Sequence, residues 1–178
     1  EQIARQALDF AMQRGGDQAV LRFDETSEYY GGRFKAVQKR TKIRSRIIAN
    51  DLISLIKNSG NVLIMVHKFA DHDSFGSCIG IAALALDYSD KVNVIVNRGD
   101  DNIRSLVEKM ETLPKYANMF LDPHSGQDLV AYNTLLVICD VNNSAIFEAP
   151  EIYENVKDVV IIDHHRKTGE FIAENYLY

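Results

Sequence analysis

The stretch VLIMVHKFADHDSFG, residues 62–76, decides the fold. Five apolar residues open it, and a loop that carries His67, Asp71 and Asp73 follows them directly. A short apolar run without a polar face is typical of a buried strand in a parallel sheet, and open α/β sheets bind ligands beyond the carboxyl ends of such strands. The sequence therefore predicts that the chemistry of this chain lies where this strand ends.

The residue types in this loop suit a divalent cation. One imidazole and two carboxylates within seven residues can converge on a single ion. A carboxylate-rich set favours Mn²⁺ or Mg²⁺ over metals that prefer thiolates. His72 lies between the two carboxylates, and we expect its side chain to point away from the site.

Two further apolar runs, residues 135–139 and 159–162, end in the same way. A single Asp after a buried strand is more often a helix cap or a turn former than a metal ligand. Three strand ends of this kind in one chain favour a shared site instead. The polar residues are Asp140 after the first run, and Asp163, His164 and His165 after the second.

Strands alternate with helices along this part of the chain. We expect Ser74 to cap a helix that ends near Asp87, and its N-terminus would present free amide groups to a bound phosphate beside Gly76. A strand over residues 92–96 and a helix over residues 102–110 follow. A turn carrying His124, which we do not expect to be a ligand, is predicted at 122–127. The order predicts an α/β fold, a mostly parallel sheet with helices on both faces.

The first 60 residues have a different character. A helical stripe over residues 3–11 leads into a strand at 19–23, and residues 29–32 predict a turn. Residues 33–46 contain seven basic residues and no acidic one, before an amphipathic helix that ends ahead of Gly60. A solvated linker is the first interpretation of this basic run. The alternative is a patch that faces the inner membrane surface or an anionic nucleotide.

Composition limits the classes of function. A chain of 178 residues with 46% hydrophobic content can bury one core and a small appendage, and its net charge of −5 disfavours a general nucleic-acid binder. Cys78 and Cys139 form no metal or redox motif and are expected in the core. No apolar run approaches the roughly 20 residues that span a bilayer.

These motifs resemble a known family. The pattern His67-x-x-x-Asp71-x-Asp73-Ser74-x-Gly76, then Asp140, then DHHR at 163–166, resembles the first three motifs of the DHH phosphoesterase superfamily. Residues 40–68 and the part before them are similar to the cyclic-di-AMP phosphodiesterases of Gram-positive bacteria. In those proteins a PAS domain and a degenerate GGDEF domain precede the DHH and DHHA1 domains. The resemblance covers essentially all of the chain.

The resemblance implies a division into three parts. Residues 1–30 would be the tail of a degenerate GGDEF domain, residues 31–59 a basic linker and amphipathic helix, and residues 60–178 a DHH domain that is incomplete at its C-terminus. We therefore expect a piece of a longer protein that lacks a fourth-motif aspartate and the nucleotide-gripping DHHA1 domain, and that is weakly active or inactive alone. The parent protein is expected to be a homodimer on the cytoplasmic side of the cell membrane. Other parts of it would make the membrane contact, and duplex nucleic acid is not an expected partner.

The resemblance also assigns roles to residues. The catalytic residues would be Asp163, which accepts the ring N–H of a metal-binding histidine, and His165, which contacts phosphoryl oxygens. The substrate contacts would be Ser74, Gly76 and Arg166. Two Mn²⁺ ions, with Mg²⁺ as an alternative, would be held by His67, Asp71 and Asp140 for the first ion and by Asp73, Asp140 and His164 for the second.

The implied reaction is hydrolysis of cyclic-di-AMP to linear pApA by a hydroxide held between the two ions, which is a role in nucleotide signalling. One alternative is another DHH hydrolase, either a manganese pyrophosphatase or a short-oligonucleotide hydrolase, and residues 1–40 distinguish these from the first interpretation. A second alternative is a regulatory or dimerising module with a vestigial metal site. A third is that the Asp and His residues serve only as structural caps.

Overall fold

The structure is a computed structural model that describes residue 4 and residues 18–23, 26–31, 42–165 and 176–177. The chain divides into two compact units, Glu1–Thr41 and Lys42–Tyr178. The predicted helix over residues 3–11 lies outside the described residues, apart from Ala4, which is helical. Among the helices that are described, none is both long and apolar enough to cross a bilayer.

The first unit contains an antiparallel hairpin. Strand β1 (Gln18–Phe23) pairs with β2 (Thr26–Gly31), from Gln18 opposite Gly31 to Phe23 opposite Thr26. The predicted strand at 19–23 is confirmed. The predicted turn at 29–32 is wrong, because Tyr29 and Tyr30 belong to β2. Aromatic residues favour the extended backbone of a strand, and pairing with β1 overrides the turn signal of the glycines that follow.

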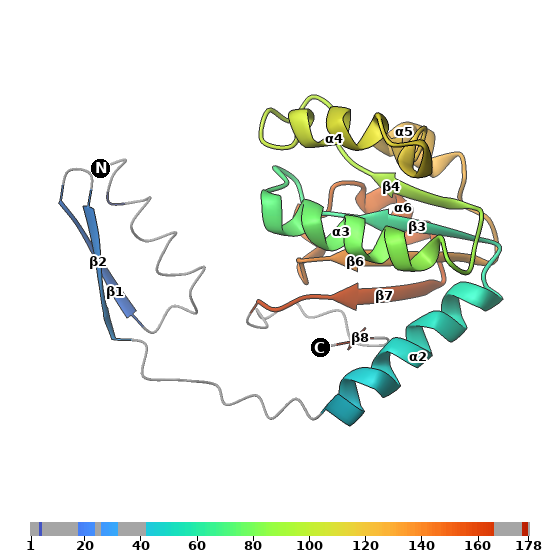
Figure 1. Ribbon diagram of the computed structural model, residues 1–178, viewed down its shortest axis with the longest axis horizontal. Helices are drawn as coiled ribbons and strands as arrows, with labels where there is room; N and C mark the ends of the chain where they lie inside the picture. Colours follow the sequence, from blue (N-terminus) through green and yellow to red (C-terminus); the bar gives the residue numbers. More distant parts are fainter. Residues whose placement is uncertain (1–3, 5–17, 24–25, 32–41, 166–175, 178) are drawn as a thin grey trace. The chain divides into compact units, whose positions relative to one another are not determined.

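The second unit is built on a six-stranded parallel sheet with β3 and β6 near its centre (Figure 1). Predicted strands at 62–66, 92–96, 135–139 and 159–162 are found as β3, β4, β6 and β7, within one residue at each end. The predicted α/β fold is confirmed. In spatial order the strands are β5 (Phe120–Leu121), β4 (Val92–Ile95), β3 (Asn61–Met65), β6 (Thr134–Cys139), β7 (Asp158–Ile162) and β8 (Tyr176–Leu177).

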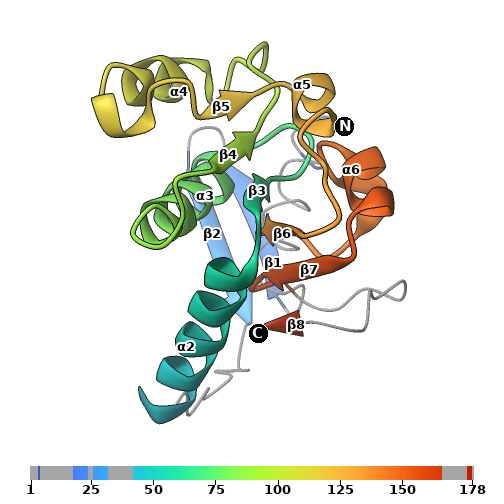
Figure 2. The same ribbon diagram turned by 90° about the vertical axis from the view of Figure 1, so that its right-hand side faces the viewer.

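Helices cover both faces of this sheet, and Figure 2 shows α3 and α6 on opposite sides of it. One face carries α2 (Lys42–Asn58), α3 (His72–Ala85) and α4 (Arg104–Glu111), which contribute Ile56, Cys78 and Val107 to its core. The other face carries α5 (Pro123–Gln127) and α6 (Pro150–Asn155). Helix α2 belongs to the second unit. The domain boundaries expected at residues 30 and 59 stay a prediction.

The apolar runs of the central strands are explained by these two cores. In β3, Val62 and Ile64 face the core with α3, while Leu63 and Met65 face the core with α6. Successive side chains of a strand point to opposite faces, so a strand buried on both faces shows no polar residue. Each fully buried side chain of this size contributes about 1.5–3 kcal/mol to folding.

The segment 122–127 is a short helix rather than the predicted turn. Asp122 accepts a hydrogen bond from the Ser125 amide, and Pro123 occupies the first helical turn, where its missing N–H has no cost. Gly126 lets α5 approach β4, because a Cβ atom there would collide with the side chain of Ile95. The 3-10 helices η1 (Pro114–Tyr116) and η2 (Ser144–Ile146) complete the described elements.

Candidate metal centre

The three predicted loops follow β3, β6 and β7, which are neighbours in the sheet. Because the strands are parallel, their carboxyl ends lie along the same edge. Residues separated by about 100 positions in the sequence are therefore brought together, as the three strand ends predicted. Two groups of possible ligands form at this edge.

The first group consists of His67, Asp71 and Asp140, whose ligand atoms all lie within 4.8 Å of one another. The resemblance had assigned these same residues to one ion. His67 Nδ1 lies 2.8 Å from the carbonyl oxygen of Lys68, and a carbonyl can only accept a hydrogen bond. Nδ1 therefore donates this hydrogen bond, and Nε2 is the ring nitrogen left to bind a cation once it is deprotonated.

Asp71 has a second task, because it is the N-cap of α3. Its Oδ1 accepts hydrogen bonds from the amides of Asp73 at 3.1 Å and Ser74 at 2.9 Å. The Ser74 hydroxyl completes a capping box with the Asp71 backbone. The prediction that Ser74 caps this helix is therefore wrong, since the extended backbone at Asp71 places the cap three residues earlier.

The cap also affects the charge of Asp71. Burial acts to raise the pKa of its carboxyl, but the amide and hydroxyl of Ser74, the charge of His67 and the Asp73 amide together hold that pKa below its ordinary value. Asp71 is therefore kept as a carboxylate, which is the form that binds a cation.

The second group consists of Asp140, His164 and His165. His164 Nε2 lies 3.1 Å from Asp140 Oδ1 and 3.4 Å from Asp73 Oδ2. Asp73 is thus close to His164 but belongs to neither group, whereas His165, which was expected to contact substrate, belongs to this one. The two imidazole rings are 4.5 Å apart between centroids.

Asp163 is buried and holds His165 in place. Its Oδ1 lies 2.7 Å from His165 Nδ1 and also accepts the His165 backbone amide at 3.2 Å. Its Oδ2 accepts a short hydrogen bond from Asn142. Asp163 therefore orients His165, and not His164, which was the histidine expected to bind metal. Asn142 was not predicted as a site residue, although its place two residues after Asp140 was a signal.

Asp140 lies at the centre of both groups. Its side chain is buried, and its backbone has a φ of 61°, the left-handed conformation that costs most residues about 1–2 kcal/mol. Its amide donates to the carbonyl of Ile162 at the end of β7, at 2.7 Å. Strained backbone of this kind concentrates at functional sites.

The electrostatics around Asp140 favour a cation. Burial raises the pKa of its carboxyl, and the negative charges of Asp73 and Asp71 raise it further, against the opposing effect of His165 and His164. Several carboxylates gathered without enough positive charge are stabilised by a divalent ion. The donor set of carboxylates and imidazoles fits Mn²⁺, and it contains no thiolate.

The remaining predicted residues have different surroundings. Ser74 is buried, and a Cβ atom on Gly76 would meet nothing within 4 Å, so α3 leaves open space there. His72 and His124 belong to neither ligand group. Arg166 lies outside the described residues.

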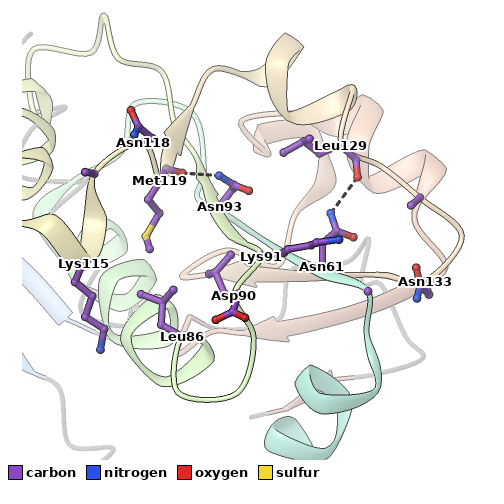
Figure 3. Close-up of a pocket in the computed structure, with 14 residues that line it drawn as sticks. Asn61, Leu86, Asp90, Lys91, Asn93, Lys115, Asn118, Met119, Leu129 and Asn133 are labelled. Atoms are coloured by element: carbon purple, nitrogen blue, oxygen red, sulfur yellow. Dashed lines mark hydrogen bonds between the residues drawn. The ribbon is translucent and has the colours of Figure 1, made fainter.

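A cavity of about 720 Å³ lies at the opposite edge of the sheet, at the amino ends of β3 and β4 (Figure 3). In this cavity the side-chain amide of Asn61 donates to the carbonyl of Leu129 at 3.0 Å, and the side-chain amide of Asn93 donates to the carbonyl of Met119 at 3.3 Å. These asparagines join loops to strands. Within the described part of the chain, both ligand groups lie at the carboxyl edge and not in this cavity.

Comparison with known proteins gives one family and a set of relatives. Residues 61–178 match the DHH family, N-terminal domain. The chain is 31% identical over 178 residues to the cyclic-di-AMP phosphodiesterase GdpP of Bacillus subtilis (strain 168), covering 98% of this chain and 27% of that protein. It is 30% identical over 178 residues to the cyclic-di-AMP phosphodiesterase PdeA of Listeria monocytogenes serotype 1/2a (strain 10403S), with the same coverage. It is 32% identical over 173 residues to GdpP of Geobacillus thermodenitrificans (strain NG80-2), covering 96% and 26%. The chain thus spans about a quarter of the length of these relatives.

Proposed function

This chain belongs to the DHH family, and we propose that it forms the metal-binding part of a phosphodiesterase that hydrolyses cyclic-di-AMP. The observation that carries the proposal is the convergence of His67 and Asp71 with Asp140 from a neighbouring strand. The names of the relatives support cyclic-di-AMP as the substrate. The alternative of purely structural caps does not explain why a buried carboxylate in strained backbone faces two histidines. The alternative of a regulatory module with a vestigial site is decided by turnover.

The ligands are assigned as the resemblance implies. His67, Asp71 and Asp140 would hold one Mn²⁺ ion, and Asp140 would also contribute to a second site together with Asp73 and His164. When bound, such ions supply activation of water and stabilisation of charge on the attacking and leaving oxygens. The imidazole ligands favour Mn²⁺ over Mg²⁺.

The other residues position the substrate. Asp163 fixes the ring of His165, and His165 contacts the phosphoryl oxygens of the diester under attack. Gly76 leaves open space for the substrate beside α3, with Ser74 and Arg166 as further contacts. Hydrolysis of one phosphodiester bond opens the ring of cyclic-di-AMP and leaves linear pApA.

The setting of this activity is also part of the proposal. Residues 1–30 would be the tail of a GGDEF domain in a longer, homodimeric protein at the cytoplasmic side of the membrane. Ligands and nucleotide contacts from elsewhere in that protein would complete the second metal site. The chain alone is then expected to be weakly active or inactive.

The test is a comparison of substrates with the full-length protein in Mn²⁺. Cyclic-di-AMP, pyrophosphate and a short RNA are incubated separately, and the products are quantified. The proposal expects turnover of cyclic-di-AMP to pApA well above that of the other two. A preference for pyrophosphate or RNA would show that the protein is another kind of DHH hydrolase. Bound metal without turnover of any of the three would favour a regulatory module.

A further inference from the structure

Phe69 is the most exposed large apolar residue beside the metal centre, with 83% of its surface accessible. It lies in the loop between β3 and α3. A single exposed apolar side chain is ordinary on a protein surface and needs no explanation by itself. The backbone of Phe69 sets it apart.

Phe69 has a φ of 57°, in the left-handed region. The other described non-glycine residues with positive φ are Asn118 and Asp140, whose short polar side chains adopt this conformation at a smaller cost than an aromatic residue does. A bulky residue there is an outlier. The chain therefore keeps an aromatic side chain where the backbone disfavours one and where the ring gains little from burial.

The loop around Phe69 is fixed on both sides. The amide of the preceding Lys68 donates to the carbonyl of Ile146 at 2.8 Å, and the amide of Glu148 donates to the carbonyl of Val66 at 3.0 Å. The following residue, Ala70, is buried in the core. The ring is thus presented on an anchored backbone, so little entropy is lost when a ligand packs against it.

The position of Phe69 relates it to the candidate ligands. It is two residues from His67 and two from Asp71. Two residues span at most about 7 Å of chain, so the Cα atom of Phe69 lies within that distance of the Cα atoms of both candidate ligands. An exposed aromatic ring carried by this loop, close along the chain to the candidate ligands, suits the flat face of a nucleobase, which stacks on aromatic side chains.

We propose that Phe69 is a stacking platform for an adenine base of the nucleotide whose phosphate lies at the metal centre. The proposal rests on the proposed function, since it takes a nucleotide diester as the substrate. It adds a substrate-binding residue outside the metal-ligand motif. Phe69 would bind the base and so contribute to the affinity for the substrate.

A fluorescence titration tests the contact without relying on turnover. The chain contains no tryptophan, so Phe69→Trp creates its sole indole. In Mn²⁺, AMP is expected to quench this indole, whereas ribose 5-phosphate, which has the phosphate but no base, is expected to leave it nearly unchanged. Tyr132→Trp is the matched control, because Tyr132 is 89% exposed and precedes β6 at the opposite edge. Equal responses to AMP and ribose 5-phosphate, or no response to AMP, would overturn the proposal.

A kinetic comparison in the full-length protein separates stacking from a structural role. Phe69→Asn removes the ring but suits positive φ, so thermal stability should be kept or raised while the KM for cyclic-di-AMP rises about ten-fold, the loss of one base stack. The kcat should change little, and Phe69→Trp should retain the wild-type KM. An unchanged KM in Phe69→Asn would overturn the proposal. If the wild-type protein does not hydrolyse cyclic-di-AMP, the proposed function fails, whereas the AMP titration still decides the stacking role.

Discussion

The carboxyl and amino edges of the parallel sheet present opposite kinds of surface. At the carboxyl edge, His67, Asp71 and Asp140 place ligand atoms within 4.8 Å of one another. At the amino edge, a cavity of about 720 Å³ is lined by Asn61 and Asn93, whose amides bond to backbone carbonyls. The candidate metal centre is therefore identified by the convergence of charged side chains and by the strained backbone at Asp140, and not by the volume of a cavity.

The largest expected effect comes from Asp140→Asn at the carboxyl edge. Asparagine keeps the shape of the side chain and tolerates positive φ, so the fold should persist while the proposed shared ligand loses its charge. Activity of the full-length protein should fall by more than about 100-fold, because even the outer partners of metal ligands are worth about 10- to 100-fold. Steady-state kinetics measures the activity of the variant against the wild type, and circular dichroism checks that the fold is kept. Activity within a few fold of wild type would contradict the shared role of Asp140.

The same variant should be more stable than the wild type when metal is absent. The pKa of Asp140 is raised in the folded chain, chiefly by burial, so its ionised form destabilises the fold at neutral pH. The stability difference between the variant and the wild type should be fully present above the pKa of folded Asp140. Below 3.8, the ordinary pKa of an aspartate, it should fall to a small value that no longer depends on pH. Chemical unfolding with a chelator, repeated from neutral to acid pH, measures it. A difference that is independent of pH would show that charge is not its cause.

A smaller loss is expected from Asp163→Asn. The exchange weakens the hydrogen bond that orients His165 but leaves the first ligand group intact, so activity should fall about 10- to 100-fold with a lesser effect on Mn²⁺ affinity. Asp158→Asn is the matched control, because Asp158 is an exposed aspartate at the start of the same strand. If Asp163→Asn lost metal as completely as Asp140→Asn, Asp163 would be a ligand instead.

At the amino edge, Asn61→Ala should affect stability alone. It removes a donor to the Leu129 carbonyl and the acceptor for the buried Thr134 hydroxyl, which should lower the free energy of unfolding by about 1–3 kcal/mol. Asn133→Ala, an exposed asparagine of the same cavity, should change it by less than about 0.5 kcal/mol. Denaturant unfolding gives both values, and kcat should be unchanged. A large loss of activity in either variant would show that the amino edge takes part in the function.

The smallest effect is expected from His72→Ala and His124→Ala. Both side chains are exposed, and neither belongs to a ligand group among the described residues. Metal content after dialysis against Mn²⁺ should equal that of the wild type. The loss of an ion in either variant would show that the wrong imidazoles have been assigned.

The sequence could predict that these residues converge, because its signals are local. Each apolar run is followed by an Asp or a His, and the parallel pairing of the three strands brings these polar residues to one edge of the sheet. It could not choose between Asp71 and Ser74 as the cap of α3, since both residue types cap helices and they lie three positions apart. It also could not show that Asp163 faces His165 rather than His164, because that choice depends on side-chain rotamers.

Shorter elements were harder to predict for a related reason. Helix α6 has six residues and β5 has two, too few for a hydrophobic period to be distinguished from chance. The pairing of β2 with β1 likewise depends on a partner strand that local propensity does not reveal.

The most direct test of the metal centre is a calorimetric Mn²⁺ titration of this chain, compared with Asp140→Asn. In the proposed assignment, His67, Asp71 and Asp140 form a complete first group, whereas the second ion would have only Asp73, His164 and the shared Asp140. Each missing carboxylate removes charge that offsets the dehydration of the cation. The account predicts one tighter and one weaker or undetectable site, and loss of the tight site in Asp140→Asn. Two equally tight sites, or an unchanged titration in Asp140→Asn, would contradict it.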